Sequence, residues 1–95
     1  MSQELLDKIK SFILNERGKY RFELQEYHSL QSDLNIYGTD AVEFIISFGN
    51  KFGVDVSNFD AEKYFKPEGY GLPDKDYPKL TIGDLLKSIE KGSLL

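Results

Sequence analysis

The sequence predicts an all-α protein, a small bundle of three main helices plus one short helical turn. Apolar residues recur at the spacing of one helical face in three segments, residues 2–17, 39–52 and 81–91. A glycine follows each segment, and glycine is common just past the end of a helix. These three glycines are Gly18, Gly53 and Gly92. Local helices joined by loops are typical of a bundle rather than of a sheet.

Length, charge and composition limit the classes of function. The chain has 95 residues, a formal net charge of −4 and no cysteine. Such a length predicts one domain, residues 1–95. The absence of cysteine excludes disulfides, thiolate metal sites and cysteine nucleophiles, and the negative charge argues against non-specific nucleic-acid binding. The sequence shows neither an apolar run of membrane-spanning length nor a secretion signal, so we expect a cytoplasmic protein that does not bind membranes.

The first helix and the loop after it differ in periodicity. The apolar face of residues 2–17 is formed by Leu5, Leu6, Ile9, Phe12 and Ile13, and we expect it to belong to the core. In residues 19–32 the helical period is lost, and aromatic and polar residues alternate, which allows a short extended stretch near residues 20–25. The only histidine, His28, has no second metal-ligand candidate nearby, so we interpret it as a loop residue.

Residues 39–52 predict a central helix that is apolar on more than one side. Its main apolar stripe contains Ala41, Val42, Ile45, Phe48 and Phe52. Phe44 and Ile46 widen this stripe, so the helix is either central to the bundle or partly covered by another molecule. We expect Thr39 to cap the helix. Gly49 costs about 1 kcal/mol relative to alanine inside a helix, which indicates close packing of a neighbouring backbone.

The C-terminal third combines a short helical turn, an insertion and the last helix. Ser57 or Asn58 is expected to cap a turn that ends near Phe65. All three prolines fall in residues 66–79, which predicts a loop inserted in the domain. The last helix opens with Thr81-Ile82-Gly83-Asp84, and a carboxylate three residues after a threonine predicts a capping box.

Five short motifs follow one another in a characteristic order. They are Asp33-Leu34-Asn35, Tyr37-Gly38-Thr39-Asp40-Ala41-Val42-Glu43, Lys51-Phe52-Gly53-Val54-Asp55-Val56, Asp60-Ala61-Glu62-Lys63 and Leu80-Thr81-Ile82-Gly83-Asp84. Their order resembles that of acyl carrier proteins over residues 33–63 and 80–91. The resemblance implies an acyl-carrier-protein-like fold. A closer resemblance is to a bacterial group of carrier-like proteins that have Tyr-Gly in place of Asp-Ser and share the stretch from Phe59 to Glu68.

The resemblance places a candidate site at the start of the second helix. In acyl carrier proteins a serine there holds a phosphopantetheine arm, and the corresponding residue in this chain is Gly38. Tyr37 replaces the acidic residue before that serine, and Thr39 replaces the leucine after it. Asp40 and Glu43 remain. The resemblance therefore implies a carrier-shaped protein with a vacant attachment position at Gly38 and no cofactor.

A protein-interaction role is the main functional hypothesis. Carriers present the acidic start of this helix to basic partners, so the resemblance implies a partner with a basic surface, such as a fatty-acid or polyketide enzyme. The two carboxylates would steer association, although each also simply complements the helix dipole, worth about 0.3–1 kcal/mol. The expected partner-binding residues are Tyr37, Thr39, Asp40, Glu43 and Phe44, where Phe44 or Ile46 supplies apolar contact if exposed.

Three alternatives stay open. The first is a functional acyl carrier protein modified at a displaced hydroxyl such as that of Thr39, although one step along a helix turns a side chain by about 100°. The second is an enzyme, which needs a nucleophile and a base within reach or a cluster of metal ligands. The sequence offers neither, so we predict no catalytic residue and no metal site. The third is a lipid or acyl-chain pocket among the aromatic residues.

Overall fold

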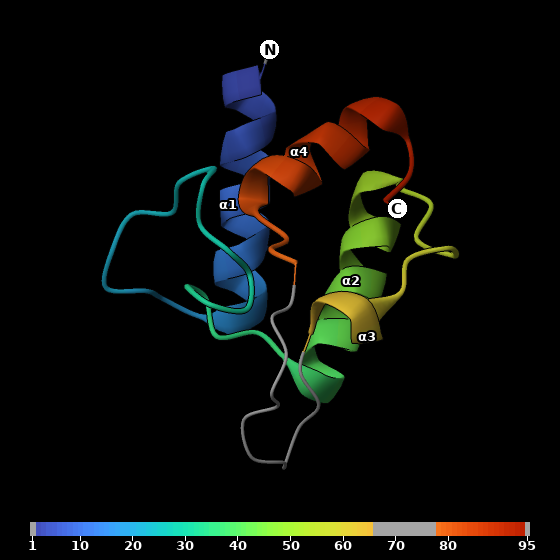
Figure 1. Cartoon of the computed structure of the whole chain (residues 1–95). Helices are drawn as coiled ribbons and strands as arrows, with labels where there is room; N and C mark the ends of the chain where they lie inside the picture. The colour runs from blue at the N-terminus through green and yellow to red at the C-terminus, as the bar shows by residue number, and fades with distance from the viewer. Residues whose placement is uncertain (1, 66–77, 95) are drawn as a thin grey trace.

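The described part of the chain contains four helices, in the order that the sequence predicts. The computed structural model describes residues 2–65 and 78–94. The helices are α1 (Ser2–Arg17), α2 (Gly38–Phe52), α3 (Ala61–Tyr64) and α4 (Ile82–Lys91) (Figure 1). Within the described residues, strand-like pairing is limited to two isolated bridges, Ser29 with Thr81 and Asp55 with Ser93. The all-α class is therefore confirmed.

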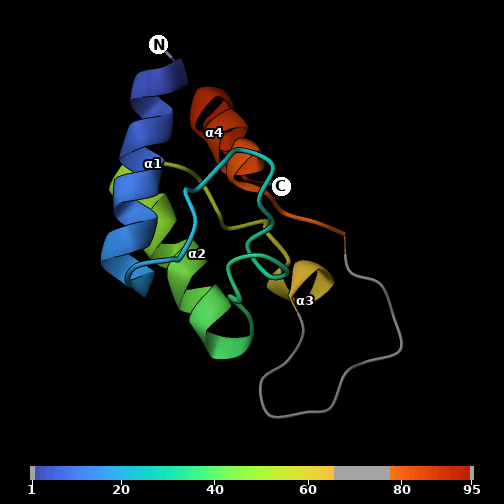
Figure 2. The ribbon, with the colours of Figure 1, turned by 90° about the vertical axis from the view of Figure 1, so that its left-hand side faces the viewer.

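The helices surround one core. α1 and α2 run in opposite directions, and α4 crosses near the beginning of α1 and the end of α2 (Figure 1). The long loop between α1 and α2 covers one side of the bundle (Figure 2). In the described part of the chain, no helix has the length and apolarity needed to cross a membrane. The start of α2 lies at the end of the molecule opposite to the N-terminus (Figure 1).

Aromatic rings join α1 to α2. The ring centroid of Phe12 lies 5.3 Å from that of Phe44, 6.1 Å from that of Phe48 and 5.7 Å from that of Phe52. Ring pairs at such separations contribute about 0.5–1.5 kcal/mol each beyond the burial of their surface. The predicted apolar face of α1 is confirmed, because its buried members are Leu6, Ile9, Phe12 and Ile13.

The predicted stripe of α2 is wrong at one residue. Val42 is 43% exposed, whereas Phe44 is buried at 2%. A helix turns about 100° per residue, so the face that contains Ala41, Phe44, Ile45 and Phe48 follows the i, i+3, i+4, i+7 spacing. Val42 and Ile46, four residues apart, lie beside that face, and Ile46 is 51% exposed. α2 therefore has an apolar strip that the core does not cover.

The loop between α1 and α2 is anchored by four buried apolar side chains. These are Leu24, Leu30, Leu34 and Ile36. The stretch at residues 20–25 forms no strand. The alternation of aromatic and polar residues in its sequence is not matched by an alternation of buried and exposed side chains, because Phe22 is exposed. Pairing occurs later in the loop. The backbone N–H of Leu30 donates to the Leu80 carbonyl at 2.8 Å, and that of Ile82 donates to the His28 carbonyl at 3.1 Å.

Capping at α4 follows the prediction. The Thr81 N–H donates to Asp84 Oδ2 at 2.9 Å, and the Asp84 N–H donates to Thr81 Oγ1 at 3.2 Å, which completes a capping box. At the other end, Gly92 adopts φ 93° and its N–H donates to the Ser88 carbonyl. Left-handed backbone of this kind favours glycine. The predicted limits of the last helix are therefore confirmed to within one residue.

The capping predictions for α2 and α3 are wrong. Tyr37, not Thr39, is the N-cap residue of α2, and its side chain makes no capping hydrogen bond. Asp60, not Ser57 or Asn58, caps α3, because its carboxylate accepts the Glu62 N–H at 3.1 Å. Capping depends on local backbone angles that a sequence with several adjacent polar residues leaves ambiguous.

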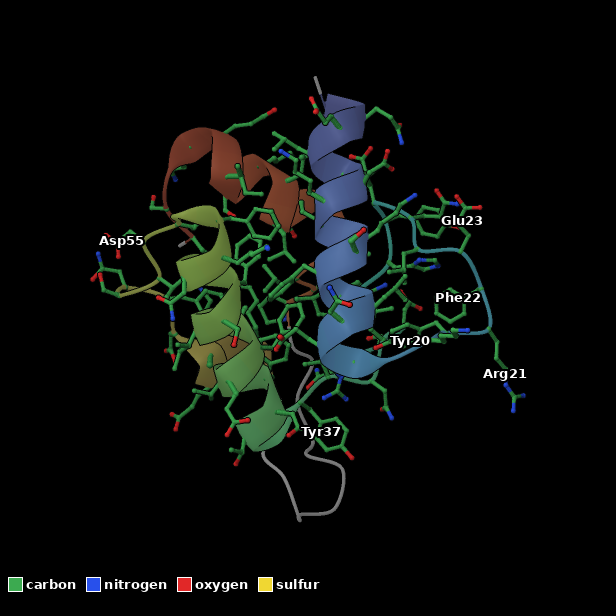
Figure 3. All side chains as sticks on the ribbon, turned by 180° about the vertical axis from the view of Figure 1, so that it is seen from behind. Tyr20, Arg21, Phe22, Glu23, Tyr37 and Asp55 are labelled. Carbon is green, nitrogen blue, oxygen red and sulfur yellow. The ribbon has the colours of Figure 1, made fainter. Side chains whose placement is uncertain are left out.

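Asp55 connects the end of α2 to the end of α4. Its N–H donates to the Gly92 carbonyl and its carbonyl accepts the Leu94 N–H, both at 2.9 Å. Its carboxylate lies on the outside of the molecule (Figure 3). The hydroxyl of Ser57 donates to it at 2.7 Å and the Ser57 N–H at 2.9 Å, so the pKa of Asp55 is held below its usual value. Ser57 therefore completes a local turn rather than a helix cap.

Most of the predicted insertion, residues 66–77, lies outside the described residues. Pro78 and Lys79, the first described residues after it, are exposed and precede α4 without helical structure. The turn before the insertion ends at Phe65, as the sequence predicts, and Phe65 is buried.

Gly49 permits the close approach that the sequence indicates. A Cβ at this position would lie 2.8 Å from the Val54 carbonyl oxygen and 3.2 Å from the Val56 side chain. The nearer contact is with backbone, which cannot turn aside as a flexible side chain can. The chain that leaves α2 therefore folds back directly over Gly49, and the Val54 N–H donates to the Gly49 carbonyl.

Replacing Gly49 by alanine is expected to destabilise the protein. Alanine favours the helix by about 1 kcal/mol, but overpacking against the Val54 carbonyl costs about 1–3 kcal/mol. Urea denaturation of Gly49→Ala should show a lower free energy of unfolding than the original chain. The matched control is Asn50→Ala, which changes an exposed residue of the same helix and should stay within about 0.5 kcal/mol. A Gly49→Ala protein as stable as the original would contradict the close approach.

Candidate functional site

The loop before α2 is shaped by the Asp-Leu motif. The Asp33 carboxylate accepts the Ser29 N–H at 2.7 Å and closes a turn. Leu34 and Ile36 are buried at 1% and 0% exposure. Between them, Asn35 adopts φ 62°, a left-handed conformation that asparagine tolerates better than most residues. The buried side chains of Leu34 and Ile36 and the turn closed by Asp33 therefore fix the backbone just before α2.

Gly38 begins α2 with unusual backbone geometry. Tyr37 is extended, with φ −160° and ψ 173°. Gly38 then has φ 63°, in the left-handed region that L-amino acids other than glycine rarely occupy. A side chain at this position would cost about 1–2 kcal/mol in that conformation. The geometry therefore favours glycine here, independently of any chemistry.

An ion pair joins the end of α1 to the start of α2. Arg17 Nη1 donates to Asp40 Oδ2 at 3.2 Å, with the Arg17 side chain 25% exposed and that of Asp40 58% exposed. Burial of the guanidinium lowers the pKa of Arg17, but hydrogen bonds to Asp40 and Tyr20 outweigh this effect and raise it overall. Arg17 Nε is buried without a hydrogen-bond partner. Asp40 is therefore partly neutralised within the chain.

Tyr20 extends this contact to the loop. Its hydroxyl donates to the Leu34 carbonyl at 2.9 Å. The side chain projects from the loop just after α1 (Figure 3). Arg17 and Tyr20 thus fix the loop and the start of α2 relative to α1, and the sequence patterns did not indicate either residue. The Arg17–Asp40 pair spans 23 residues, so no local periodicity could have revealed it.

A small depression lies next to the ion pair. Its volume is about 140 Å³, and its lining is Glu16, Arg17, Asp40, Glu43 and Phe44. Three of these five residues carry carboxylates, so the depression is acidic around a single arginine. Glu43 is exposed, and none of the ion pairs formed by the described residues includes it. Of the two predicted carboxylates, Glu43 is therefore the freer one.

The structure separates the predicted partner-binding residues by exposure. Thr39, Asp40 and Glu43 are exposed, and Tyr37 is half-buried. Tyr37 lies at the start of α2, below the end of α1 (Figure 3). Phe44 is buried and does not meet the condition of exposure, whereas Ile46 does. The exposed surface at the start of α2 thus comprises Thr39, Asp40, Val42, Glu43 and Ile46, a set called the α2 surface below.

His28 has a local role in the loop. Its Nδ1 accepts the Gln25 N–H at 2.9 Å. Its ring lies between those of Phe22 and Tyr27, at centroid distances of 4.7 Å and 4.6 Å. These contacts fit the interpretation of His28 as a loop residue. Within residues 2–65 and 78–94, no three His, Cys, Asp or Glu side chains are grouped so that they could hold a metal ion.

The helical bundle, the Asp-Leu loop and the acidic start of α2 together fit an acyl-carrier-protein-like fold. The chain is 29% identical to an acyl carrier protein of Thermotoga maritima over 89 residues, which covers 94% of this chain and 91% of that protein. It is 32% identical to an acyl carrier protein of a Picosynechococcus species over 63 residues, 66% of this chain and 78% of that protein. The chain belongs to the family described as "Protein of unknown function (DUF1493)", which matches residues 2–95.

The backbone at Gly38 yields a stability prediction. Gly38→Ser should lower the free energy of unfolding by about 1–2 kcal/mol, because serine resists φ 63°. Gly38→Asn should cost less, since asparagine visits the left-handed region more readily. Thermal or urea denaturation of both variants compares the two costs. A serine variant as stable as the original chain would show that the left-handed geometry is not required.

Proposed function

We propose that this chain is a non-enzymatic protein-interaction module, a carrier-like protein that contacts its partner through the α2 surface without a phosphopantetheine arm. The similarity to acyl carrier proteins over most of the chain supports a carrier rather than a catalyst. The observation that carries the proposal is Gly38, a residue without a side chain whose backbone is left-handed at the start of α2.

The residues present at this helix start do not fit a phosphopantetheine arm. The arm is attached through a phosphodiester to a serine oxygen in acyl carrier proteins, and by resemblance Gly38 occupies that position. Glycine has no oxygen to bond to phosphorus. Its φ of 63° also disfavours the serine that would supply one. The function proposed here therefore depends on surface recognition alone.

Charge and apolar contact are combined on the α2 surface. Asp40 and Glu43 lie one turn apart, and Val42 and Ile46 lie beside them at 43% and 51% exposure. Exposed carboxylates raise association rates and orient a basic partner. Exposed aliphatic side chains supply the apolar centre that a stable interface needs. The partner proposed is a protein with a basic surface, such as an enzyme of fatty-acid or polyketide type.

Arg17 is expected to compete with that partner for Asp40. The guanidinium already occupies one carboxylate oxygen at 3.2 Å. A basic side chain of the partner would have to share Asp40 with Arg17 or displace Arg17. Glu43 can bind such a side chain without displacing a residue of this chain. We therefore assign Glu43 the larger part in steering and Asp40 a part that depends on release from Arg17.

A carrier modified at Thr39 is the second candidate function. Thr39 is exposed and adjacent to Gly38, which is the observation in its favour. Against it, the side chain of Thr39 points about 100° away from that of its neighbour around the helix, and its β-branch hinders attack at phosphorus.

Intact-mass spectrometry separates the two candidates. After co-expression with a promiscuous phosphopantetheinyl transferase, the chain should keep its unmodified mass, because position 38 offers no hydroxyl. A known acyl carrier protein in the same cells is the positive control. A mass increase equal to one phosphopantetheine, abolished by Thr39→Val, would establish the displaced carrier and refute the proposed function.

Charge reversal tests the α2 surface directly. A tagged Asp40→Lys, Glu43→Lys variant should lose any protein that the original chain captures from a lysate of its native host, because the two changes replace attraction by repulsion. Glu43→Lys alone should lose most of it, since that residue is free of the Arg17 pair. Arg17→Gln, which frees Asp40, should increase recovery.

The matched control changes the same charge elsewhere. Glu4→Lys with Glu90→Lys alters two exposed carboxylates near the beginning of α1 and the end of α4, the end of the molecule opposite to the α2 surface (Figure 1). Circular dichroism verifies that each variant stays folded. Equal recovery by both double variants would refute the α2 surface as the site of partner binding.

A further inference from the structure

A second depression lies between α3 and α4 and is positively charged. Its volume is about 430 Å³. The charged side chains that line it are Lys79, Lys87, Lys91 and Asp84. Three ammonium groups against one carboxylate leave a local charge of +2, whereas the whole chain carries −4. The depression shares no residue with the α2 surface.

Nothing in the described part of the chain neutralises these lysines. The ion pairs there are Lys10–Glu23 and Arg17–Asp40, and neither includes a lysine of the depression. The Asp84 carboxylate already accepts the Thr81 N–H and hydroxyl at 2.9 Å and 3.2 Å. Lys87 and Lys91 are four residues apart on α4, an arrangement in which like charges repel. Among residues 2–65 and 78–94, the lysines of the depression therefore lie close together without an ion-pair partner.

Other parts of the fold do not explain this grouping. The helix dipole favours Lys91, which lies in the last turn of α4, but it disfavours Lys79, which lies just before the first turn. The groove of about 950 Å³ between α1 and α2 contains charges of both signs, namely Glu4, Asp7, Glu16, Lys8 and Lys51. Of the three depressions described among residues 2–65 and 78–94, only the α3–α4 depression has more positive than negative side chains in its lining.

We propose that the α3–α4 depression binds a small molecule that carries phosphate groups. Lysine ammonium groups are compact point charges with three donors each and are common phosphate ligands. The hydroxyls of Tyr64 and Ser93, which also line the depression, add further hydrogen-bonding groups. A volume of about 430 Å³ lies in the range of small-molecule sites, whereas a protein partner needs a broader surface of about 800 Å².

Tyr64 gives the depression an ordered aromatic wall. Its ring stacks on that of Phe59 at 5.2 Å with an interplanar angle of 12°. The Lys63 ammonium lies 5.8 Å from the centre of the Tyr64 ring, which adds a fourth cation close to the depression. Leu80 and Leu94, both buried, complete the lining beside α4. The exposed lysines thus surround a lining whose apolar part is held by buried residues.

Titration calorimetry on the full chain tests this proposal, with pyrophosphate and ATP as probes at an ionic strength of about 0.15 M, where charges more than about 8 Å apart are largely screened. Both probes should bind saturably. Lys87→Gln with Lys91→Gln should weaken binding about tenfold or more, because the two changes remove two of the three ammonium groups that line the depression. The matched control, Lys8→Gln with Lys51→Gln, removes the same charge from the α1–α2 groove and should change affinity less than about twofold.

Lys79→Gln provides a second test if the α4 double variant fails to fold, since Lys79 lies outside any helix. Absence of saturable binding by both probes would overturn the proposal. Equal weakening by the two double variants would also overturn it, because it would indicate a general charge effect. Tighter binding of a poly-glutamate peptide than of ATP, lost with the α4 lysines, would instead assign the depression to an acidic protein segment.

Discussion

The backbone pairing between the α1–α2 loop and the beginning of α4 is the contact on which the site depends. Leu30 donates to Leu80, and Ile82 donates to His28, at 2.8 Å and 3.1 Å. The first N–H groups of a helix have no hydrogen-bond partner within the helix. Carbonyl groups of the loop accept hydrogen bonds from these N–H groups of α4, and the same bonds fix the position of the loop. Gly83 donates to Glu26 in the same way at 2.8 Å. Since the same loop leads into α2, residues late in the chain fix where α2 begins.

Short sequence motifs correctly predicted the features that depend on residues close together in the sequence. The capping box of Thr81 and Asp84 needs only residues three apart, and both of its hydrogen bonds form. Gly53 and Gly92 end their helices with left-handed backbone, at φ 68° and 93°. The cost of Gly49 inside a helix indicated a close neighbour, and the Val54 carbonyl is that neighbour. At each of these glycines, the residue type is nearly the only one that satisfies the backbone.

The sequence patterns did not determine which apolar residues are buried or which distant charges pair, because both depend on how the helices pack. Val42 and Phe44 are both apolar and both lie in α2, yet only their angle to α1 determines that Phe44 packs on Phe12 while Val42 stays exposed. Arg17 and Asp40 pair across 23 residues, and each looks like an ordinary solvated charge in the sequence. The alternation at residues 20–25 suggested a strand, but a strand needs a partner strand to satisfy its hydrogen bonds. The described chain offers that pairing at Ser29 instead.

The backbone at the start of α2 favours glycine at position 38. If position 38 merely lacked a serine hydroxyl, alanine or another small residue would serve equally well there. A φ of 63° makes glycine the residue of lowest strain, and Tyr37 and Asp40 on either side are held by the extended backbone and by Arg17. A serine at this position would therefore disturb the entry into α2. The exposed carboxylates and aliphatic side chains of the α2 surface make no such demand on the backbone of position 38.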